Sequence, residues 1–278
     1  MTIVRGAADV ARCHPCFNEE AHERVGRVHL PIARRCNIQC AFCERRTCAN
    51  LGQHHPGWTE RVLTVDEAVA HVGRLVEVHR HEAFVVGVAG PGDPLANEET
   101  FEALNQVHRA WPNLTTCISS NGLLLADTLP RLLDAGIRAL TVTVNAPDPE
   151  VGSQIYLWVR YDGVIHQGEE GAALLIERQF LGIRAALDAG LAVKVNTVLI
   201  PGVNDAHVER LAGRLREAGV TLMNIMPLIP SGAMRNRRAP TCDELSEART
   251  RCETILPQFR LCKQCRADIV WFPDAVGV

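Results

Sequence analysis

Three cysteines, Cys36, Cys40 and Cys43, lie close together in the segment CNIQCAFC. A segment this short can wrap three thiolates around one iron–sulfur cube. Such a cube usually takes four thiolates. Because no fourth cysteine is adjacent, the spacing predicts one iron that is open to a small chelating ligand. A zinc site completed by a distant fourth ligand is the alternative, although zinc sites usually use tighter CxxC spacing.

The chain contains eleven cysteines, far more than one cube needs. Six further side chains are candidate iron ligands: Cys16, His29, Cys48, Cys117, Cys262 and Cys265. The last two form a CxxC pair, and we expect Cys48 and Cys117 to lie at the strand ends near the first three cysteines. A lone strand histidine such as His29 is more often a core residue, but imidazole beside thiolates can also bind iron.

The elements that must position these residues follow from the hydrophobic pattern. The predicted strands cover residues 28–33, 84–89, 115–119, 139–144, 192–199 and 222–227. The predicted helices cover residues 64–79, 98–110, 128–135, 171–189 and 205–218, and Gly136, Gly190 and Gly219 end three of them. This order predicts an α/β fold with a parallel sheet curled into a partial (β/α)6 TIM-like barrel. A flat doubly wound sheet is the alternative, but no GxGxxG segment follows the first strand.

Three regions follow from this alternation. Residues 1–27 form an N-terminal arm that carries Cys16, residues 28–235 form the partial barrel, and residues 236–278 form a C-terminal extension with the CxxC pair. We expect both ends to bind a cluster.

Composition excludes several classes of protein. With 47% hydrophobic and 22% charged residues among 278, the chain can bury a full core. Its net charge of −3 argues against a nucleic-acid partner, whose phosphates require basic surfaces. No apolar segment is long enough for a signal peptide or a membrane span, so a cytoplasmic location is expected. In that reducing compartment, abundant cysteines more often bind metal than form disulfides.

The CxxxCxΦC pattern after the first strand of a partial barrel resembles the radical S-adenosylmethionine (SAM) superfamily. The resemblance implies a 4Fe-4S cluster whose open iron binds SAM, and SAM cleavage to a 5′-deoxyadenosyl radical. It also implies a set of SAM-binding residues: Phe42, Gly90, Gly92, Asp93, Ser120, Asn121, Asn145, Asn196 and Met226. Phe42 would lie against the adenine. The polar residues could equally cap turns, and Met226 could equally belong to the core.

Longer motifs make the resemblance more specific. The segments HPCFNEEAH at residues 14–22, AGPGDPLAN at 89–97 and CKQCRAD at 262–268 are similar to those of the NifB family of nitrogenase cofactor biosynthesis proteins. This resemblance implies a radical SAM enzyme that fuses two further 4Fe-4S precursor clusters. A carbide from SAM and an added sulfur complete the Fe8S9C precursor of the nitrogenase cofactor, in a lyase and methyl-transfer reaction.

The NifB resemblance also implies roles for the remaining candidates. One precursor cluster would be held by His29, Cys48 and Cys117, and the other by Cys16, Cys262 and Cys265. Glu19 and His22 are candidates for proton transfer. The implied partners are an iron–sulfur cluster donor protein, an electron donor, and a carrier or scaffold protein that accepts the product. We expect the product to leave by docking, since the sequence resembles the standalone form without an appended carrier domain.

Two other function classes stay open at this point. One is a radical SAM enzyme with an auxiliary C-terminal cluster that acts on an organic substrate, and the other is a non-catalytic iron–sulfur or zinc carrier. An enzyme for an organic substrate would not need Cys16, His29 and Cys117. A carrier would not need the glycine-rich turn at residues 90–94.

Overall fold

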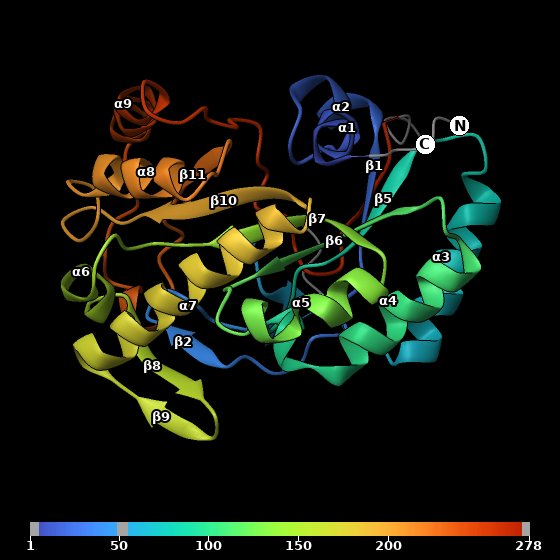
Figure 1. Ribbon diagram of the computed structural model, residues 1–278, viewed down its shortest axis with the longest axis horizontal. Coiled ribbons are helices and arrows are strands. Elements are labelled where there is room, and N and C mark those ends of the chain that lie inside the picture. Colours follow the sequence, from blue (N-terminus) through green and yellow to red (C-terminus); the bar gives the residue numbers. More distant parts are fainter. Residues whose placement is uncertain (1–5, 49–54, 274–278) are drawn as a thin grey trace.

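The computed structural model of the protein describes residues 6–48 and 55–273. Its main sheet has seven strands in the order β11-β10-β7-β6-β5-β1-β12 (Figure 1). The first six strands in this order are parallel to their neighbours, and β12 pairs antiparallel with β1. Their bounds are β1 (Gly26–His29), β5 (Phe84–Val88), β6 (Thr115–Ser120), β7 (Ile137–Thr143), β10 (Ala192–Leu199), β11 (Met223–Pro227) and β12 (Val270–Trp271).

Helices that connect successive strands cover the outer face of this sheet (Figure 1). The main ones are α3 (Val65–Val78), α4 (Glu98–Ala110), α5 (Leu125–Asp134), α7 (Gly168–Asp188), α8 (Val208–Glu217) and α9 (Cys242–Glu253). Helices α3 and α9 begin with a capping box, in which Thr64 pairs with Glu67 and Thr241 with Glu244. Their buried residues form one apolar core with the outward-facing strand residues.

The predicted α/β partial barrel is confirmed, and all six predicted parallel strands are present. Gly136, Gly190 and Gly219 have positive φ of 73°, 79° and 94° directly after α5, α7 and α8, as their predicted C-cap role requires. The first strand was predicted to continue to residue 33, but β1 ends at His29. Pro31 has no N–H to donate to the neighbouring strand, so the regular ladder stops there.

Several smaller elements were not predicted. Strands β2 (Ile38–Cys40), β8 (Tyr156–Tyr161) and β9 (Val164–His166) form a separate antiparallel sheet, and β3 (Arg46–Thr47) pairs with β4 (Trp58–Thr59). Short helices are α1 (Ala7–Cys13), α2 (Glu19–Arg24) and α6 (Pro149–Ser153), with 3₁₀ turns η1 (Pro94–Ala96) and η2 (Gly232–Met234). Elements of two to seven residues leave no periodic pattern long enough to read.

The N-terminal arm, residues 6–25, closes one end of the half-barrel. Val10 and Phe17 pack against Ala139 of β7 and Ala192 of β10 in a small apolar cluster of their own. Two alanines at these positions leave room for the larger side chains of the arm. This packing brings Cys16, which follows α1, to the inner face of the sheet.

The C-terminal crossing, residues 258–271, spans the open side of the half-barrel (Figure 1). At one edge of the sheet, the Phe259 N–H donates to the Met223 carbonyl at 2.7 Å. At the other edge, β12 pairs with β1. Between the two edges, the Ala267 N–H donates to the Trp58 carbonyl at 2.9 Å. The CxxC pair therefore lies over the mouth of the sheet.

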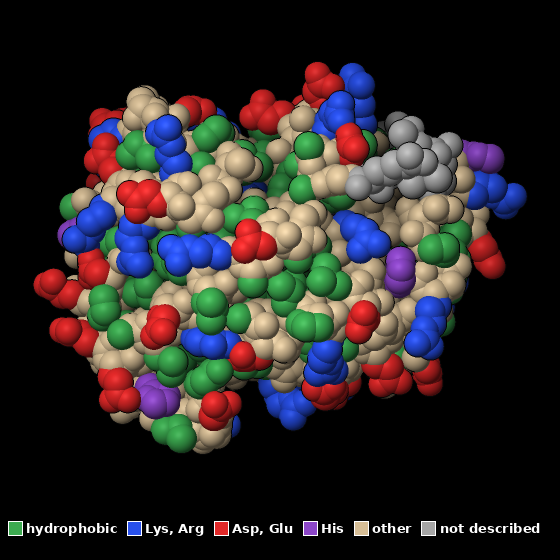
Figure 2. Space-filling view, viewed as in Figure 1, with side chains coloured by type: hydrophobic (Ala, Val, Ile, Leu, Met, Phe, Trp, Pro, Cys, Tyr) green, Lys and Arg blue, Asp and Glu red, His purple; other side chains and the backbone are tan. Residues whose placement is uncertain are grey.

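The outer surface has a mixed charge. On the face shown in Figure 2, Lys and Arg side chains are interspersed with Asp and Glu over the outer helices. Within the described ranges, no helix combines the length and the apolarity that a bilayer crossing needs.

We predict that Phe17→Ala loosens the arm. Removing this buried ring costs about 3 kcal/mol, because it leaves a cavity against Ala139 and Ala192. Hydrogen exchange of residues 7–24 should accelerate about 100-fold, while residues 192–199 keep their protection. Leu157→Ala, at a side chain 45% exposed on β8, is the matched control and should change neither. Unchanged exchange in the arm of Phe17→Ala would contradict this account of its docking.

Candidate functional site

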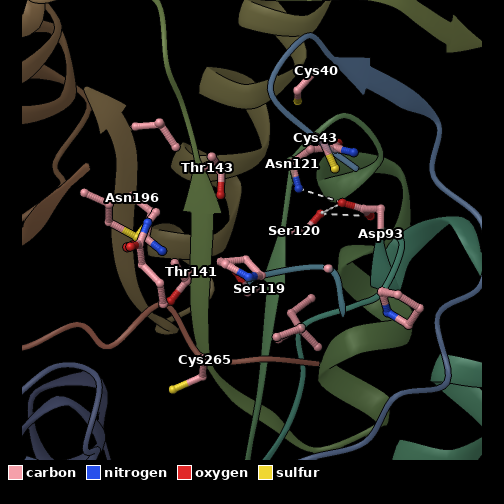
Figure 3. A pocket seen from close by; sticks show the side chains of 18 of the residues that line it. Cys40, Cys43, Asp93, Ser119, Ser120, Asn121, Thr141, Thr143, Asn196 and Cys265 are labelled. Atoms are coloured by element: carbon pink, nitrogen blue, oxygen red, sulfur yellow. Dashed lines mark hydrogen bonds between the residues drawn. The ribbon is translucent and has the colours of Figure 1, made fainter. Parts of the chain in front are cut away.

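A single cavity on the inner face of the half-barrel gathers most of the predicted ligands. Eight of the nine line it: Cys16, His29, Cys36, Cys40, Cys43, Cys117, Cys262 and Cys265. Figure 3 shows Cys40 and Cys43 at one end and Cys265 at the other. Side chains of Ser119, Thr141, Thr143 and Asn196 lie between them. Segments from both chain ends and from the barrel thus share one chamber.

The cysteine triad is held by a tight loop that enters β2. The Gln39 amide donates to the carbonyls of Cys40 and Cys43, at 3.0 and 2.9 Å, and this bridges the loop. All three cysteines are free thiols. Burial raises the pKa of Cys36 to about 12 and that of Cys40 well above its usual value. Thiolates here therefore need positive charge beside them, which iron supplies.

The alternative of a single zinc ion finds no support in the described part of the chain. There, no three His, Cys, Asp or Glu side chains converge closely enough to hold one ion. A zinc ion draws its thiolates to about 2.3 Å, whereas a cube binds each thiolate through a different iron.

The turn after β5 is joined to β6 by the buried carboxylate of Asp93. It accepts hydrogen bonds from Ser120 Oγ at 3.0 Å, the Asn121 N–H at 2.6 Å and the Leu95 N–H at 2.9 Å (Figure 3). Burial raises the pKa of Asp93 to about 6. Ser120 Oγ also lies 3.1 Å from the second carboxylate oxygen, so each oxygen has two donors within hydrogen-bond distance. At Gly92, an added Cβ would collide with the Arg35 carbonyl.

The polar layer between the two ends presents amides to the cavity. Asn121 donates to Asn37 Oδ1 at 2.6 Å and lies 3.8 Å from Cys36 Sγ. Asn145 Oδ1 accepts from the Val198 N–H at 2.9 Å, and Asn145 Nδ2 is buried with no partner among the described residues. Asn196 Oδ1 accepts from Asn224 Nδ2 at 3.0 Å. An unpaired amide on a cavity wall fits a polar ligand.

Parallel register places His29 and Cys117 in one row. His29 of β1 is opposite Gly87 of β5, which is opposite Cys117 of β6. A Cβ added at Gly87 would lie 2.8 Å from Cys117 Sγ and 3.4 Å from His29 Cδ2. The sequence predicted Cys117 at the end of its strand, but it is the third of six residues in β6. It therefore lies deeper in the half-barrel than the triad.

Cys16, Cys262 and Cys265 meet at the other end of the cavity. Lys194 Nζ donates to the Cys16 carbonyl at 2.8 Å, and the Cys262 thiol lies 3.7 Å from Met226 Sδ. Burial, with a smaller contribution from Cys16, raises the pKa of Cys265 to about 12. Burial also raises the pKa of Cys16, with Cys262 adding to the shift. The three thiols therefore interact electrostatically across this end of the cavity.

The SAM-binding candidates also fall on the cavity wall, with one exception. Phe42, Gly92, Asp93, Ser120, Asn121, Asn145, Asn196 and Met226 line it. Gly90 does not, but its φ of 152° positions the turn that leads into Pro91 and Gly92, which do.

Three other predicted residues lie outside the cavity lining. Cys48 is held by its backbone, where its N–H donates to the Thr59 carbonyl at 2.8 Å, and it is the last described residue before residue 55. Glu19 is exposed in the first turn of α2. His22 is buried, and its Nδ1 lies 2.7 Å from the Pro15 carbonyl and 3.1 Å from Arg27 Nη1. The structure therefore brings neither proton-transfer candidate to the chamber.

Several cavity residues were not singled out from the sequence, among them His14, Arg45, Tyr156 and Lys194. Lys194 had a signal, because a lysine inside an apolar strand segment is almost never fully buried without a partner. Its residue is 2% exposed, and its Nζ lies 4.9 Å from the Phe259 ring centroid. His14 was quoted only as part of a motif. Burial lowers its pKa to about 3, which keeps the ring neutral.

Comparison with known proteins agrees with this geometry. Residues 30–215 match the family model of the Radical SAM superfamily. The FeMo cofactor biosynthesis protein NifB of Methanocaldococcus jannaschii is 47% identical over 263 residues, covering 95% of this chain and 87% of that protein. NifB of Methanocaldococcus infernus is 46% identical, covering 93% and 85%. NifB of Klebsiella pneumoniae is 41% identical, covering 95% of this chain and 57% of its own length.

Solved structures share the fold at lower identity. A radical SAM methyltransferase from Sphaerobacter thermophilus superposes with a TM-score of 0.56 and 23% identity, covering 85% of this chain and 64% of its own. Methylornithine synthase (PylB) has a TM-score of 0.54 and 14% identity, covering 91% and 68%. These likenesses support the curled half-barrel.

We predict that Gly87→Ala damages the row that contains His29 and Cys117. The added methyl cannot fit 2.8 Å from Cys117 Sγ, so it displaces the sulfur from the imidazole. After anaerobic reconstitution, the variant should bind about four fewer irons than the wild type, because one cube contains four irons. Gly213→Ala is the matched control, because a Cβ there meets nothing within 4 Å. Iron analysis and circular dichroism test this, and undiminished iron in Gly87→Ala would refute it.

Proposed function

The chain belongs to the radical SAM superfamily and, within it, to the NifB family that acts in FeMo cofactor biosynthesis, and from this premise we propose its reaction. The protein fuses two 4Fe-4S clusters into the Fe8S9C precursor of the nitrogenase cofactor. The central carbide comes from SAM, and a ninth sulfur is added. The two clusters are substrates, whereas a third 4Fe-4S cluster is the resident cofactor.

The observation that carries this proposal is the shared cavity. Cys36, Cys40 and Cys43 face the same chamber as the row of His29 and Cys117 and the group of Cys16, Cys262 and Cys265. Three separate sets of iron ligands around one space fit a reaction in which two clusters and SAM must meet. An enzyme for an organic substrate needs no such convergence.

The triad would hold the resident cluster, and its buried thiols fit that role. When bound, this cluster supplies the electron that cleaves the sulfonium of SAM to the 5′-deoxyadenosyl radical. The chain's own part is to orient SAM and to exclude water from the radical. Phe42 would cover the adenine at the triad, and the negative charge of Asp93 would attract the methionine ammonium.

The polar layer would bind the rest of SAM. Asn145 Nδ2, which lacks a partner among the described side and main chains, would donate to the ribose or the carboxylate. Ser120 and Asn121 are held by Asp93, so their remaining polar groups keep fixed directions. Asn196 lies farther toward the middle of the chamber (Figure 3). Such preorganised donors orient a polar ligand at low entropic cost.

Each substrate cluster would be held by fewer protein ligands than the four that a 4Fe-4S cluster usually has. His29 and Cys117 would bind one, with Cys48 as a proposed third ligand, and Cys16, Cys262 and Cys265 would bind the other. Fewer than four thiolates per cluster leave irons that can be bridged during fusion. One SAM would donate its methyl group to a substrate sulfide and leave as S-adenosylhomocysteine. The radical from a second SAM would then take a hydrogen atom from that methyl and become 5′-deoxyadenosine.

Proton removal from the methyl-derived carbon needs groups at the cavity wall. Glu19 and His22 stay candidates by resemblance alone, because neither lines the chamber and His22 is engaged by Pro15 and Arg27. The proposal therefore places them away from the reacting atoms. The partners it requires are an iron–sulfur cluster donor, an electron donor and a carrier or scaffold protein that accepts the product.

Iron content is the first test. Anaerobic reconstitution should give about twelve irons per chain if three 4Fe-4S clusters bind. Electron paramagnetic resonance before and after SAM addition should show one cluster signal that responds to SAM. A metal content of only about four irons per chain, or of zinc alone, would contradict the proposal. A count near eight with an organic product would point to the enzyme with one auxiliary cluster.

Two cysteine variants separate the resident cluster from the substrate clusters. Cys40→Ala should abolish SAM cleavage, because it removes a ligand of the resident cluster. Cys262→Ala should keep reductive SAM cleavage and lose carbide insertion. Cys242→Ala, at an exposed thiol at the start of α9, is the matched control and should behave as wild type. Chromatography of 5′-deoxyadenosine and isotope tracing of the SAM methyl carbon are the readouts. Formation of 5′-deoxyadenosine by Cys40→Ala would contradict the ligand assignment.

A further inference from the structure

Two of the three histidines that line the cavity, His29 and His14, have opposite hydrogen-bond environments at Nδ1. His29 Nδ1 lies 3.1 Å from the Arg266 carbonyl, which can only accept. His29 Nδ1 therefore carries the proton, and Nε2 has the free lone pair. A carbonyl or carboxylate behind Nδ1 is the usual arrangement for a histidine that binds metal through Nε2.

At His14, Nδ1 accepts a hydrogen bond instead of donating one. The Cys16 N–H donates to His14 Nδ1 at 3.1 Å, so the lone pair is on Nδ1. The neutral ring must then carry its proton on Nε2. The residue is 1% exposed, it lines the cavity, and its Nε2 has no hydrogen-bond partner within the part of the chain that the structure describes. A buried donor thus faces the chamber without an acceptor.

The surroundings fix this donor in place. The His14 ring packs edge-on against Phe17, with centroids 4.9 Å apart. Lys194 Nζ lies 5.5 Å from the Phe17 ring and donates to the Cys16 carbonyl at 2.8 Å. The ring and the cysteine backbone are therefore locked as one unit. His14 and Cys16 thus line the cavity from the same turn of the arm.

We propose that His14 donates a hydrogen bond from Nε2 to a sulfide of the substrate cluster held by Cys16, Cys262 and Cys265. This inference rests on the proposed function. Coordination of iron through His14 Nε2 is disfavoured. It would require the ring proton to be on Nδ1, where it would face the Cys16 N–H. A bridging sulfide offers the missing acceptor and leaves the three thiolates as ligands.

The hydrogen bond from His14 would change the reduction potential of the bound cluster. A hydrogen bond to a cluster sulfur stabilises the more reduced, more negative state and raises the reduction potential. His14 would thereby tune one substrate cluster without binding its iron. His29 would bind the other directly, so His14 and His29 would have different tasks.

The test compares His14→Phe, His14→Gln and His29→Phe after anaerobic reconstitution. His14→Phe keeps a planar ring but removes the donor. His14→Gln keeps an acceptor for the Cys16 N–H and a donor for the sulfide. His29→Phe is the contrasting control that removes a proposed ligand. The readouts are iron content, potentiometric titration followed by electron paramagnetic resonance, and nitrogen hyperfine coupling from a coordinated imidazole.

We expect His14→Phe to keep the wild-type iron content and to shift the potential of one cluster to a more negative value. His14→Gln should restore that potential. The signal of a coordinated imidazole should persist in both His14 variants and vanish in His29→Phe. In the wild type, one coordinated imidazole is expected, and this measurement stands even if His14→Phe does not fold.

Three outcomes would overturn the inference. Wild-type potentials in His14→Phe would show that no sulfide accepts from the ring. Loss of about four irons or of an imidazole coupling in that variant would make His14 a ligand instead. A wild-type chain that binds only about four irons would remove the proposed function and this inference with it. The first two results would leave the proposed function intact.

Discussion

The parallel register of the central strands is the constraint on which the chamber depends. In a parallel sheet, residues opposite each other on neighbouring strands share a face and form a row. One row runs His29, Gly87, Cys117, Ala139 and Ala192 across five strands. Its three small residues leave the space that the arm and a ligand can occupy. A shift of one residue in any strand would turn its side chains to the helical face.

The two chain ends complete what the half-barrel leaves open. The arm packs against the alanines of that row, and the C-terminal crossing runs from β11 to β1 over the mouth. Each end contributes cysteines to the same end of the cavity. Because Lys194 of β10 binds the Cys16 carbonyl, the barrel itself positions the arm. The cavity thus gains its full set of ligands only when both chain ends pack on the half-barrel.

Periodicity was enough to predict the six parallel strands and the helices between them. Long amphipathic segments such as α4, and glycine C-caps such as Gly136, carry strong local signals. The hairpin of β8 and β9 and the pairing of β12 with β1 were missed. Strands β9 and β12 are short, and β12 pairs with a strand far away in sequence. Within the site, motif resemblance supplied the ligand candidates, whereas Lys194 and His14 became visible only through their burial and partners.

By itself, the sequence determined the chemistry that is available: a thiolate triad with an open fourth position, a second supply of thiols at both ends, and an α/β half-barrel to hold them. Only the tertiary structure decided which of these groups share a chamber and in what protonation form. Coordination and hydrogen bonding act over a few ångströms. Whether Cys16 shares a cavity with Cys265, and whether His29 carries its proton on Nδ1, depend on contacts between segments far apart in the chain. The proton position of His14 is set within its own turn, but only the fold brings that turn to the chamber.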